Sequence, residues 1–423
     1  MLPTHEDIRT TRLANGVLVM SEAMPGIESV ALGVWADAGS MDEGPGEFGQ
    51  AHFLEHMLFK GTETRSAFDL AEAIEDVGGQ LNAYTERETT HVFARILAEH
   101  LPLAVTLLAD MICHSAFAQV ELDRERQVVI EEIRKYESLP EERIHDLIMD
   151  GLYAGGGLGH QILGTEESVL AFTRANLLTC WQRHFAADRV LITAAGKVNH
   201  SALVAQVEEA FAALPLPLGT RLAQPVGTTV RRILEEEDED QVHFCWGGRT
   251  FPATDPRNFA LAMIDAALGA STTSRLFQEV REKRGLAYDV ASYTMGFRET
   301  GLICATGATS PETFPEVLSL VRREVEGMRR QGMTAKELAR AKEQMKSGMA
   351  LSLESTTERM RRLASHQLTW GTVYPLGEMI ARMNEVTLDD IQQVLDTVLN
   401  SAEWTFTAIG PIDEKLVAEV LGS

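Results

Sequence analysis

The sequence predicts an α+β protein made of two homologous domains, each a mixed, mostly antiparallel sheet packed with helices. Two observations predict this class. The chain has 423 residues, which is more than one ordinary hydrophobic core organises, so at least two domains are expected. Each half of the chain also mixes hairpin strands with helices of roughly 10 to 20 residues, a pattern typical of α+β folds rather than of doubly wound parallel sheets.

The two halves repeat the same order of elements. The first half is expected to run through a strand at 29–40, helices at 51–62 and 66–78, a hairpin at 79–97, a helix at 168–185 and a strand at 189–198. The second half is expected to run through a strand at 241–250, helices at 259–269 and 274–285, a hairpin at 286–308, a helix at 387–399 and a strand at 403–412.

Four landmarks can be paired between the halves at nearly constant separation. The separations are 212, 208, 206 and 214 residues, for Val30 with Val242, Gly61 with Gly269, Gly79 with Gly285, and Gly196 with Gly410. A repeat of this length predicts two domains of similar fold. Between them, "LPLPLGTRLAQPVGTT" at 214–229 has no helical or strand period and is interpreted as a linker. The expected division is a first domain at 1–214, a linker at 215–229 and a second domain at 230–423.

The charge of the chain is strongly acidic. Its 38 basic and 62 acidic residues give a net charge of −24. Such a protein repels the phosphates of nucleic acids, so nucleic acid is not an expected partner. The charge favours cations or basic peptides, and solubility alone is the simpler explanation.

The cysteines and the N-terminal segment indicate the compartment. The four cysteines are scattered and form no C-x-x-C pair, so neither a thiolate zinc site nor a redox motif is indicated, and a reducing compartment is expected. The first residues contain no apolar signal region, and no uncharged apolar stretch of 18 residues occurs. We therefore expect a cytoplasmic protein that does not cross a membrane.

The stretch "AHFLEHMLFKGT" at 51–62 places two histidines four residues apart. On a helix His52 and His56 lie on one face, one turn apart, and both imidazoles can reach one metal ion. Glu55 shares that face and can take a proton from a water bound beside the ion. The apolar residues around the motif would keep water away from the site.

A third metal ligand is expected from the acidic helix at 121–137. Glu125, Val128, Val129 and Glu132 fall on one face of this helix, with a carboxylate at each end. A carboxylate turned inward beside valines needs a cation, which a zinc ion would supply, so Glu132 is favoured over the solvated Glu131. Without the histidine pair, an amphipathic helix with surface glutamates would be the simpler interpretation.

These residues resemble the inverzincin zinc metallopeptidases, which include pitrilysin, insulin-degrading enzyme and the mitochondrial processing peptidase. The resemblance covers nearly the whole chain and is closest to the short, processing-peptidase-like bacterial branch. It is carried by an H-x-x-E-H motif with a glutamate 76 residues later, by the twofold repeat, and by "GGQLNAYTERE", "ERQVVIEEI" and "SRLFQEVREKRGLAY".

The resemblance implies roles for the residues of the motif. His52, His56 and Glu132 match the ligands of one Zn²⁺ ion per chain, and Glu55 matches the general base. Glu125 matches a family glutamate that supports the site from behind the ligands. The implied fold is that of the processing-peptidase-like metallohydrolases, with 1–214 as the catalytic zinc-binding domain.

The resemblance also implies substrate-binding residues. "LNAYT", with Asn82 and Ala83, resembles the edge strand to which a peptide substrate adds as a further strand. Arg281 and Tyr288 in the second domain match an arginine–tyrosine pair that reaches the substrate and steadies the developing oxyanion. In the segment aligned with 51–62, the motif positions are occupied by residues that cannot bind metal: Ala260, Met263 and Ile264. The second domain is therefore expected to bind substrate but no metal.

The expected function is a zinc-dependent endopeptidase that cleaves short or unfolded peptides, with basic peptides favoured, inside a chamber formed by two chains. A homodimer is expected because one chain carries both the zinc motif and the Arg281–Tyr288 pair; a heterodimer with a metal-free homologue is the alternative. A second function class is a non-catalytic or partner-dependent subunit of a peptidase or larger assembly. A third hypothesis, a peptidase dedicated to maturing one peptide, differs from the zinc-dependent endopeptidase only in its substrate.

Overall fold

The computed structural model describes residues 7–216 and 225–422, which form two compact units. Of the described residues, 7–135, 161–216 and 350–375 form the first unit, and 136–160, 225–349 and 376–422 form the second. Each unit thus includes one segment from the other half of the sequence, which the sequence did not anticipate. Within the expected linker, residues 217–224 lie outside the described residues.

The first unit is built on a six-stranded sheet with the order β1-β2-β6-β3-β5-β4. Its strands are β1 (Asp7–Arg12), β2 (Leu18–Ala23), β3 (Ser29–Ala36), β4 (Gln80–Thr85), β5 (Thr90–Leu97) and β6 (Val190–Gly196). Strands β2 and β6 pair in parallel, and all other neighbours pair antiparallel. Strand β4 forms one edge of this sheet.

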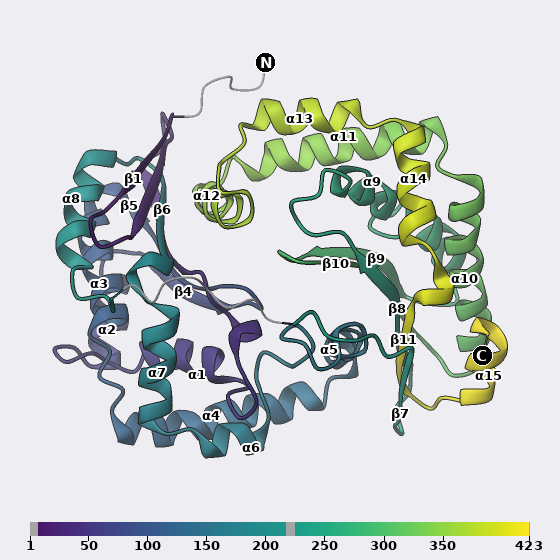
Figure 1. Ribbon diagram of the computed structural model, residues 1–423, viewed down its shortest axis with the longest axis horizontal. Helices are drawn as coiled ribbons and strands as arrows, with labels where there is room; N and C mark the ends of the chain where they lie inside the picture. The colour runs from purple at the N-terminus through teal and green to yellow at the C-terminus, as the bar shows by residue number, and fades with distance from the viewer. Residues whose placement is uncertain (1–6, 217–224, 423) are drawn as a thin grey trace. The chain divides into compact units, whose positions relative to one another are not determined.

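Helices cover both faces of the first sheet (Figure 1). The helices of this unit are α1 (Gln50–Leu58), α2 (Ala67–Glu75), α3 (Leu101–Cys113), α4 (Gln119–Glu137), α6 (Glu166–Ala171), α7 (Arg174–His184), α8 (His200–Ala210) and α12 (Thr356–Trp370). The larger core joins one face of the sheet to α1, α3, α4 and α7. On the other face, Trp35 and Phe93 pack with Met360 and Leu363 of α12.

The second unit repeats this arrangement with five strands in the order β7-β11-β8-β10-β9. The strands are β7 (Arg232–Glu236), β8 (Val242–Thr250), β9 (Asp289–Gly296), β10 (Gly301–Thr309) and β11 (Thr405–Gly410). Strands β7 and β11 pair in parallel, and the rest pair antiparallel.

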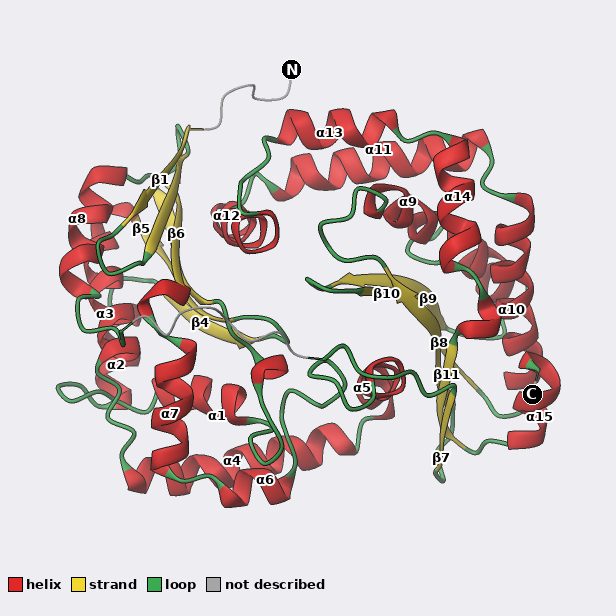
Figure 2. Cartoon of the chain, in the orientation of Figure 1, coloured by secondary structure: helices red, strands yellow, loops and turns green. Residues whose placement is uncertain are grey.

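The helices of the second unit also lie on both faces of its sheet (Figure 2). They are α5 (Pro140–Tyr153), α9 (Asn258–Leu268), α10 (Phe314–Gln331), α11 (Ala335–Ser352), α13 (Leu376–Glu385), α14 (Leu388–Val398) and α15 (Glu414–Leu421). Helix α5 packs on β8 and β11, as α12 packs on β3 and β6 in the first unit. The exchange of segments is therefore reciprocal: each half of the chain supplies one helix to the sheet of the other.

The predicted fold class and the twofold repeat are confirmed. The landmark glycines end equivalent strands, β6 and β11, with nearly identical φ angles of +128° at Gly196 and +130° at Gly410. An added Cβ would lie 2.2 Å from the carbonyl oxygen of Ser29 in one case and 2.5 Å from that of Gln241 in the other. Only glycine fits a left-handed conformation this close to a neighbouring backbone. The same local constraint therefore shaped both halves.

Candidate metal centre

Helix α1 carries the two histidines, and its start is fixed by two residues that precede the motif, Gly49 and Glu43. Its N-cap, Gly49, has φ +92°, and a Cβ there would lie 2.5 Å from the carbonyl oxygen of Leu163. The buried carboxylate of Glu43 accepts hydrogen bonds from the backbone N–H groups of Gly49 and Ala51, at 2.8 and 2.6 Å. A carboxylate at a helix N-terminus satisfies unpaired N–H groups and the helix dipole. Both features hold the first turn, and hence His52, in place.

The structure brings His52, His56 and Glu132 together within the first unit. The Nε2 atoms of His52 and His56 lie 3.8 and 3.6 Å from Oε2 of Glu132, and the ligand atoms of the three residues all lie within 4.8 Å of one another. Two atoms that bind one tetrahedral zinc at about 2.1 Å lie about 3.4 Å apart. The donor set and its spacing therefore fit a zinc ion. Within the described part of the chain, this is the one cluster of its kind.

The protonation of His52 suits a metal ligand. Burial, followed by the charge of the neighbouring His56, lowers the pKa of His52 to about 3, so its imidazole is neutral at physiological pH. Its Nδ1 is buried without a hydrogen-bond partner in the described structure, and its Nε2 is directed toward Glu132. The ring otherwise contacts the ring of His56, with the two centroids 4.5 Å apart, and a metal ion would give its buried nitrogen pair a polar partner.

Glu125 orients His56 from the side opposite the cluster. The Nδ1 atom of His56 lies 2.8 Å from Oε1 of Glu125, and Nζ of Lys60 lies 2.7 Å from the other carboxylate oxygen. Burial alone would raise the pKa of Glu125, but the hydrogen bonds from His56 and Lys60 lower it below its ordinary value. Burial likewise opposes the charged form of His56, yet Glu125 and Glu132 raise its pKa. The Nδ1–H group donates to Glu125, which leaves Nε2 of His56 facing Glu132.

Glu55 lies on the same helix as the two histidines, and a residue of the sheet holds its carboxylate. The hydroxyl of Thr85, the last residue of β4, donates a hydrogen bond of 2.6 Å to Oε2 of Glu55. Burial raises the pKa of Glu55 even though this hydrogen bond opposes the shift. A carboxylate with a raised pKa accepts a proton more readily than an ordinary one. One oxygen of Glu55 is thus positioned by β4.

Sequence reasoning missed Lys60 and Thr85. Lys60 lies four residues after His56, so the helical period could have placed it on the ligand face as the cation that a buried Glu125 requires. Thr85 lies on a strand 30 residues from Glu55 in the sequence, and no local pattern connects the two.

One argument for Glu132 was wrong although the residue does face the histidines. Val128 is 51% exposed and contributes no apolar wall, whereas Val129 is buried. Glu131 is solvated as expected, since its side chain is 71% exposed and pairs with Arg134. The side chain of Glu132 is 42% exposed, so it is accessible rather than enclosed by valines. The carboxylate of Glu132 is therefore accessible to solvent.

The expected peptide-binding residues lie on the edge strand β4. Asn82 is exposed; its Nδ2 donates to Tyr84 Oη at 3.1 Å, and its Oδ1 accepts from the N–H of Ala83 at 2.9 Å. The Ala83 N–H is therefore not used in pairing with β5, and its side chain is buried. This backbone donor lies on the open edge of the sheet.

The arginine–tyrosine pair lies in the second unit. Nη1 of Arg281 donates to the carbonyl oxygen of Tyr288 at 3.0 Å, and its guanidinium carbon lies 4.4 Å from the centre of the Tyr288 ring. Tyr288 is otherwise open to solvent, with 80% of the residue exposed. Arg281 lies on a π-helical turn, Phe277–Glu282. The structure thus brings the two predicted residues into contact with each other.

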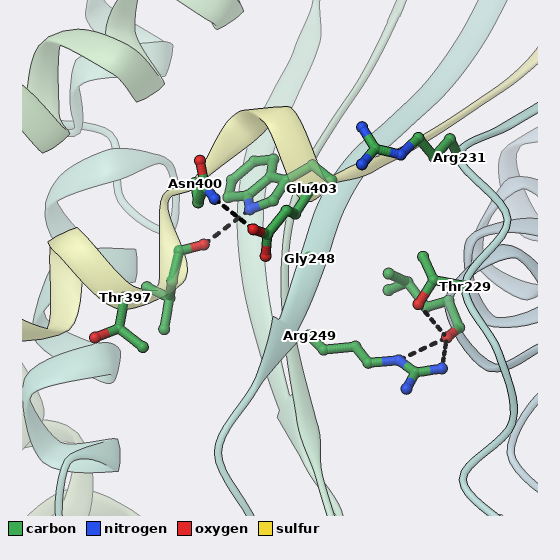
Figure 3. A pocket seen from close by; sticks show the side chains of 10 residues that line it. Thr229, Arg231, Gly248, Arg249, Thr397, Asn400 and Glu403 are labelled. Carbon is green, nitrogen blue, oxygen red and sulfur yellow. Dashed lines mark hydrogen bonds between the residues drawn. The ribbon is translucent and has the colours of Figure 1, made fainter.

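Helix α9 of the second unit has the place of α1 but none of its polar residues. Ala260, Met263 and Ile264 are all buried in the core. The second unit does contain a cavity of about 370 Å³, but no residue of α9 lines it (Figure 3). There, Arg249 donates to the carbonyl oxygen of Leu152 and Glu403 accepts from Asn400. The charged groups labelled in this cavity are engaged by their neighbours, and they offer no metal-binding set.

No helix among the described residues combines the length and the apolarity that a membrane crossing requires.

Known proteins resemble the chain along nearly its whole length. A family model described as Insulinase (Peptidase family M16) matches residues 18–166, and one described as Peptidase M16 inactive domain matches residues 171–345. A protein of Streptomyces coelicolor named an uncharacterized zinc protease is 38% identical in an alignment of 416 residues that covers 96% of this chain and 90% of that protein. A protein of Bacillus subtilis with the same kind of name is 38% identical over 378 residues, 89% of this chain and 92% of its own.

Solved structures share the fold at lower identity. A structure described as a peptidase M16 inactive domain from Pseudomonas fluorescens has a TM-score of 0.87 at 23% identity, covering 96% of this chain and 98% of that chain. A protease from Helicobacter pylori has a TM-score of 0.87 at 20% identity, covering 97% and 100%. Both confirm the two-sheet fold.

Proposed function

The chain belongs to the insulinase (M16) family of peptidases, as its motifs predict, and from this premise we propose that it is a zinc-dependent endopeptidase acting on short or unfolded peptides. The observation that carries the proposal is the meeting of His52, His56 and Glu132 within 4.8 Å, with Glu55 on the same helix as the two histidines. A structural zinc site would be closed by four protein ligands, whereas three ligands and a neighbouring base are the arrangement of hydrolytic sites.

Each residue of the cluster has a part in the proposed reaction. Zinc held by His52, His56 and Glu132 would lower the pKa of a water molecule and polarise the scissile carbonyl. Glu55 accepts the proton of the attacking water and then donates it to the leaving amine. Burial raises the pKa of Glu55, which favours this uptake, and Thr85 limits the movement of its carboxylate. Glu125 accepts from Nδ1 of His56 and so keeps its Nε2 facing Glu132, where it would be available to hold a zinc ion.

The proposed substrate lies along β4 as an additional strand. The backbone of an edge strand offers unpaired N–H and C=O groups, and an extended peptide satisfies them. The Ala83 N–H, now bound by the side chain of Asn82, is the donor that such a peptide would take over. Asn82 would then turn its amide toward the peptide. Because Thr85 at the end of β4 contacts Glu55, a peptide on this edge leads directly to the base.

Arg281 and Tyr288 are proposed to act on the substrate from the second unit. Their contact keeps a guanidinium and a phenol together at an exposed position, where both can donate hydrogen bonds. Two such donors can stabilise the negative charge that develops on the carbonyl oxygen.

The proposed assembly is a homodimer in which two chains enclose a chamber, in the cytoplasm. One chain carries both the zinc motif and the arginine–tyrosine pair, so a metal-free partner is not required for either. The net charge of −24 favours encounter with basic peptides.

The test uses the purified chain alone. Its mass in solution and its zinc content are measured, and cuts in a peptide mixture are mapped by mass spectrometry. One zinc per chain and internal cuts that stop on addition of a chelator and resume with zinc are expected. A chain that binds no zinc, or binds it and cleaves nothing, would instead be a non-catalytic subunit. Removal of terminal residues alone would exclude the endopeptidase.

A further inference from the structure

Arg361 of α12 lies beside the proposed peptide-binding edge of the first unit. Its guanidinium carbon lies 5.5 Å from the centre of the Tyr84 ring on β4 and 5.4 Å from that of Phe93 on β5. The helix comes from the second half of the sequence, so the sequence around β4 does not predict the contact with this arginine. An arginine over aromatic rings keeps its guanidinium plane and its hydrogen-bond donors exposed at the ring edge.

The charge of Arg361 is only weakly compensated. Its one ion pair in the described structure joins Nη1 to Oε1 of Glu358 at 3.5 Å, and its Nε is buried without a hydrogen-bond partner. The side chain is 37% exposed, and a long ion pair at such a position contributes little energy. The guanidinium therefore has donors available for a further anion.

Among the described residues, the charged groups near Arg361 are one further arginine and one glutamate. His91, which pairs with Tyr84 across the ladder, is buried, and burial followed by the charge of Arg361 lowers its pKa to about 3, so it is neutral. Arg95 is exposed two residues beyond Phe93, on the same face of β5, and forms no ion pair in the described part of the chain. Glu358 is the acid that faces Arg361. This face is therefore locally basic in a chain with a net charge of −24.

The strand geometry relates this basic face to the catalytic cluster. The Tyr84 ring stacks on Phe93 on the side of the sheet covered by α12, whereas the next residue, Thr85, contacts Glu55 of α1 on the other side. Side chains of an extended peptide alternate in the same way. A peptide paired with β4 would place every second side chain on the side of the sheet where Tyr84 and Arg361 lie. One of these side chains would be nearest to Arg361, and it would belong to a residue within about two positions of the cleaved bond.

We propose that Arg361, seated on Tyr84, selects an aspartate or glutamate side chain of the substrate at this position; the inference rests on the proposed endopeptidase function. A carboxylate can accept two parallel hydrogen bonds from the guanidinium, which neither an amide nor an ammonium group can do. The overall acidity of the chain acts at long range on encounter, whereas contact with Arg361 acts on the bound peptide. The preferred substrate is thus a peptide with an acid next to the cleavage site, even if basic residues lie elsewhere in it.

The experiment uses quenched peptides that are identical except at one position near the cleaved bond, which carries Glu, Gln or Lys in turn. The wild-type zinc-loaded protein is expected to cleave the Glu peptide with a kcat/KM at least 10-fold above that of the Gln peptide. Arg361→Gln is expected to bring this ratio to about 1 while kcat/KM for the Gln peptide changes less than 3-fold. Glu358→Gln, which removes the competing carboxylate, is expected to raise the ratio.

Arg330→Gln is the matched control. Arg330 also forms an ion pair of 3.5 Å within one helix, with Glu326, but it lies on α10 in the second unit. This variant should keep the wild-type ratio. If the wild type cleaves all peptides with no preference for Glu, or if the preference survives Arg361→Gln, the inference is wrong while the endopeptidase stands. If the wild type cleaves none of them and no peptide mixture either, both are wrong. If Arg361→Gln does not fold, the ratio in Glu358→Gln decides: an unchanged or lower value overturns the inference.

Discussion

The two units share a scaffold and differ at one helix. Strands β2, β6, β3, β5 and β4 follow the same order as β7, β11, β8, β10 and β9, and each sheet is covered on one face by a helix from the other half of the chain. Yet α1 carries His52, Glu55 and His56, whereas α9 carries Ala260, Met263 and Ile264 at the aligned positions. The candidate metal-binding set is therefore not a consequence of the fold, because the second unit has the same fold without it.

The difference shows that the buried polar residues of the first unit carry a desolvation cost that the second unit avoids. Buried histidines and carboxylates must be desolvated, and they persist only where hydrogen bonds or a cation compensate. In the first unit the compensation comes from Glu125, Lys60 and Thr85, each drawn from outside the motif or from its end. In the second unit three apolar side chains fill the same face and need no partner.

The largest effect is expected from copying α9 into α1. The triple variant His52→Ala, Glu55→Met, His56→Ile should bind less than about 0.1 zinc per chain and should cleave no peptide, because two ligands and the base are removed. It should nevertheless fold, with a Tm within about 5 °C of the zinc-free wild type, because apolar residues replace buried polar ones. Metal analysis and calorimetry measure both. An unfolded triple variant would mean that the scaffold depends on the motif, contrary to the comparison of the units.

Removing only the base separates catalysis from binding. Glu55→Gln keeps the shape of the side chain and both histidines, so zinc content should stay at one per chain. The kcat should fall by about 10²–10⁴-fold, the range that a general base contributes. Glu131→Gln, on the solvated face of α4, is the control and should match the wild type in both measurements. Cleavage by Glu55→Gln at the wild-type rate would assign the proton transfer to another group.

The support behind the ligands should have a smaller effect, on affinity rather than on chemistry. Glu125→Gln removes the carboxylate that holds His56 and pairs with Lys60. Zinc should bind about 10–100-fold more weakly, as is usual when such a partner is lost. Competition with a chelator of known affinity measures this change, with Glu131→Gln again as the control. At saturating zinc, kcat should recover most of its wild-type value; a failure to recover would mean that Glu125 acts on the reaction itself.

The scaffold could be predicted from the sequence because the repeat depends on residues that local geometry restricts. Gly196 and Gly410 mark strand ends where no other residue fits, and the metal motif follows the helical period, so both are visible in one short segment. The two exchanged helices were not predictable in this way. An amphipathic pattern in α5 or α12 shows that one face is buried, but not which sheet buries it.

The same limit applies to the partners of the motif. The choice of Glu132 was right in position, but the valine argument for it failed at Val128, because a helical face continues only as far as something packs on it. Thr85 is brought to Glu55 by strand pairing, and Arg361 is brought to Tyr84 by helix exchange; both are properties of the whole unit. A local sequence pattern can therefore indicate candidate ligands, but not the residues from distant segments that contact them.

The smallest effect concerns the one acid that α9 carries in its buried face. Asp265 is buried and accepts a hydrogen bond from Ser292 of β9, whereas the aligned residue of α1 is the apolar Met57. Burial raises the pKa of Asp265 to about 6. The folded state therefore binds this proton more tightly than the unfolded state, in which the pKa is about 3.9. The contribution of Asp265 to the free energy of unfolding should fall as pH rises from about 4 to about 6 and should then stay constant at its lower value.

Asp265→Asn should remove this fall in the free energy of unfolding, because the amide stays neutral and can still accept a hydrogen bond from Ser292. Well above pH 6 the variant should be more stable than the wild type by about 3 kcal/mol, and near pH 4 the difference should vanish. Denaturant unfolding at several pH values measures this, with Glu316→Gln, an exposed acid on α10, as the control. A difference that does not change between pH 4 and pH 7 would mean that Asp265 is ionised in the folded state throughout. The second unit would then hold a buried charge as the first does, and the contrast between α1 and α9 would lie in the ligand set alone.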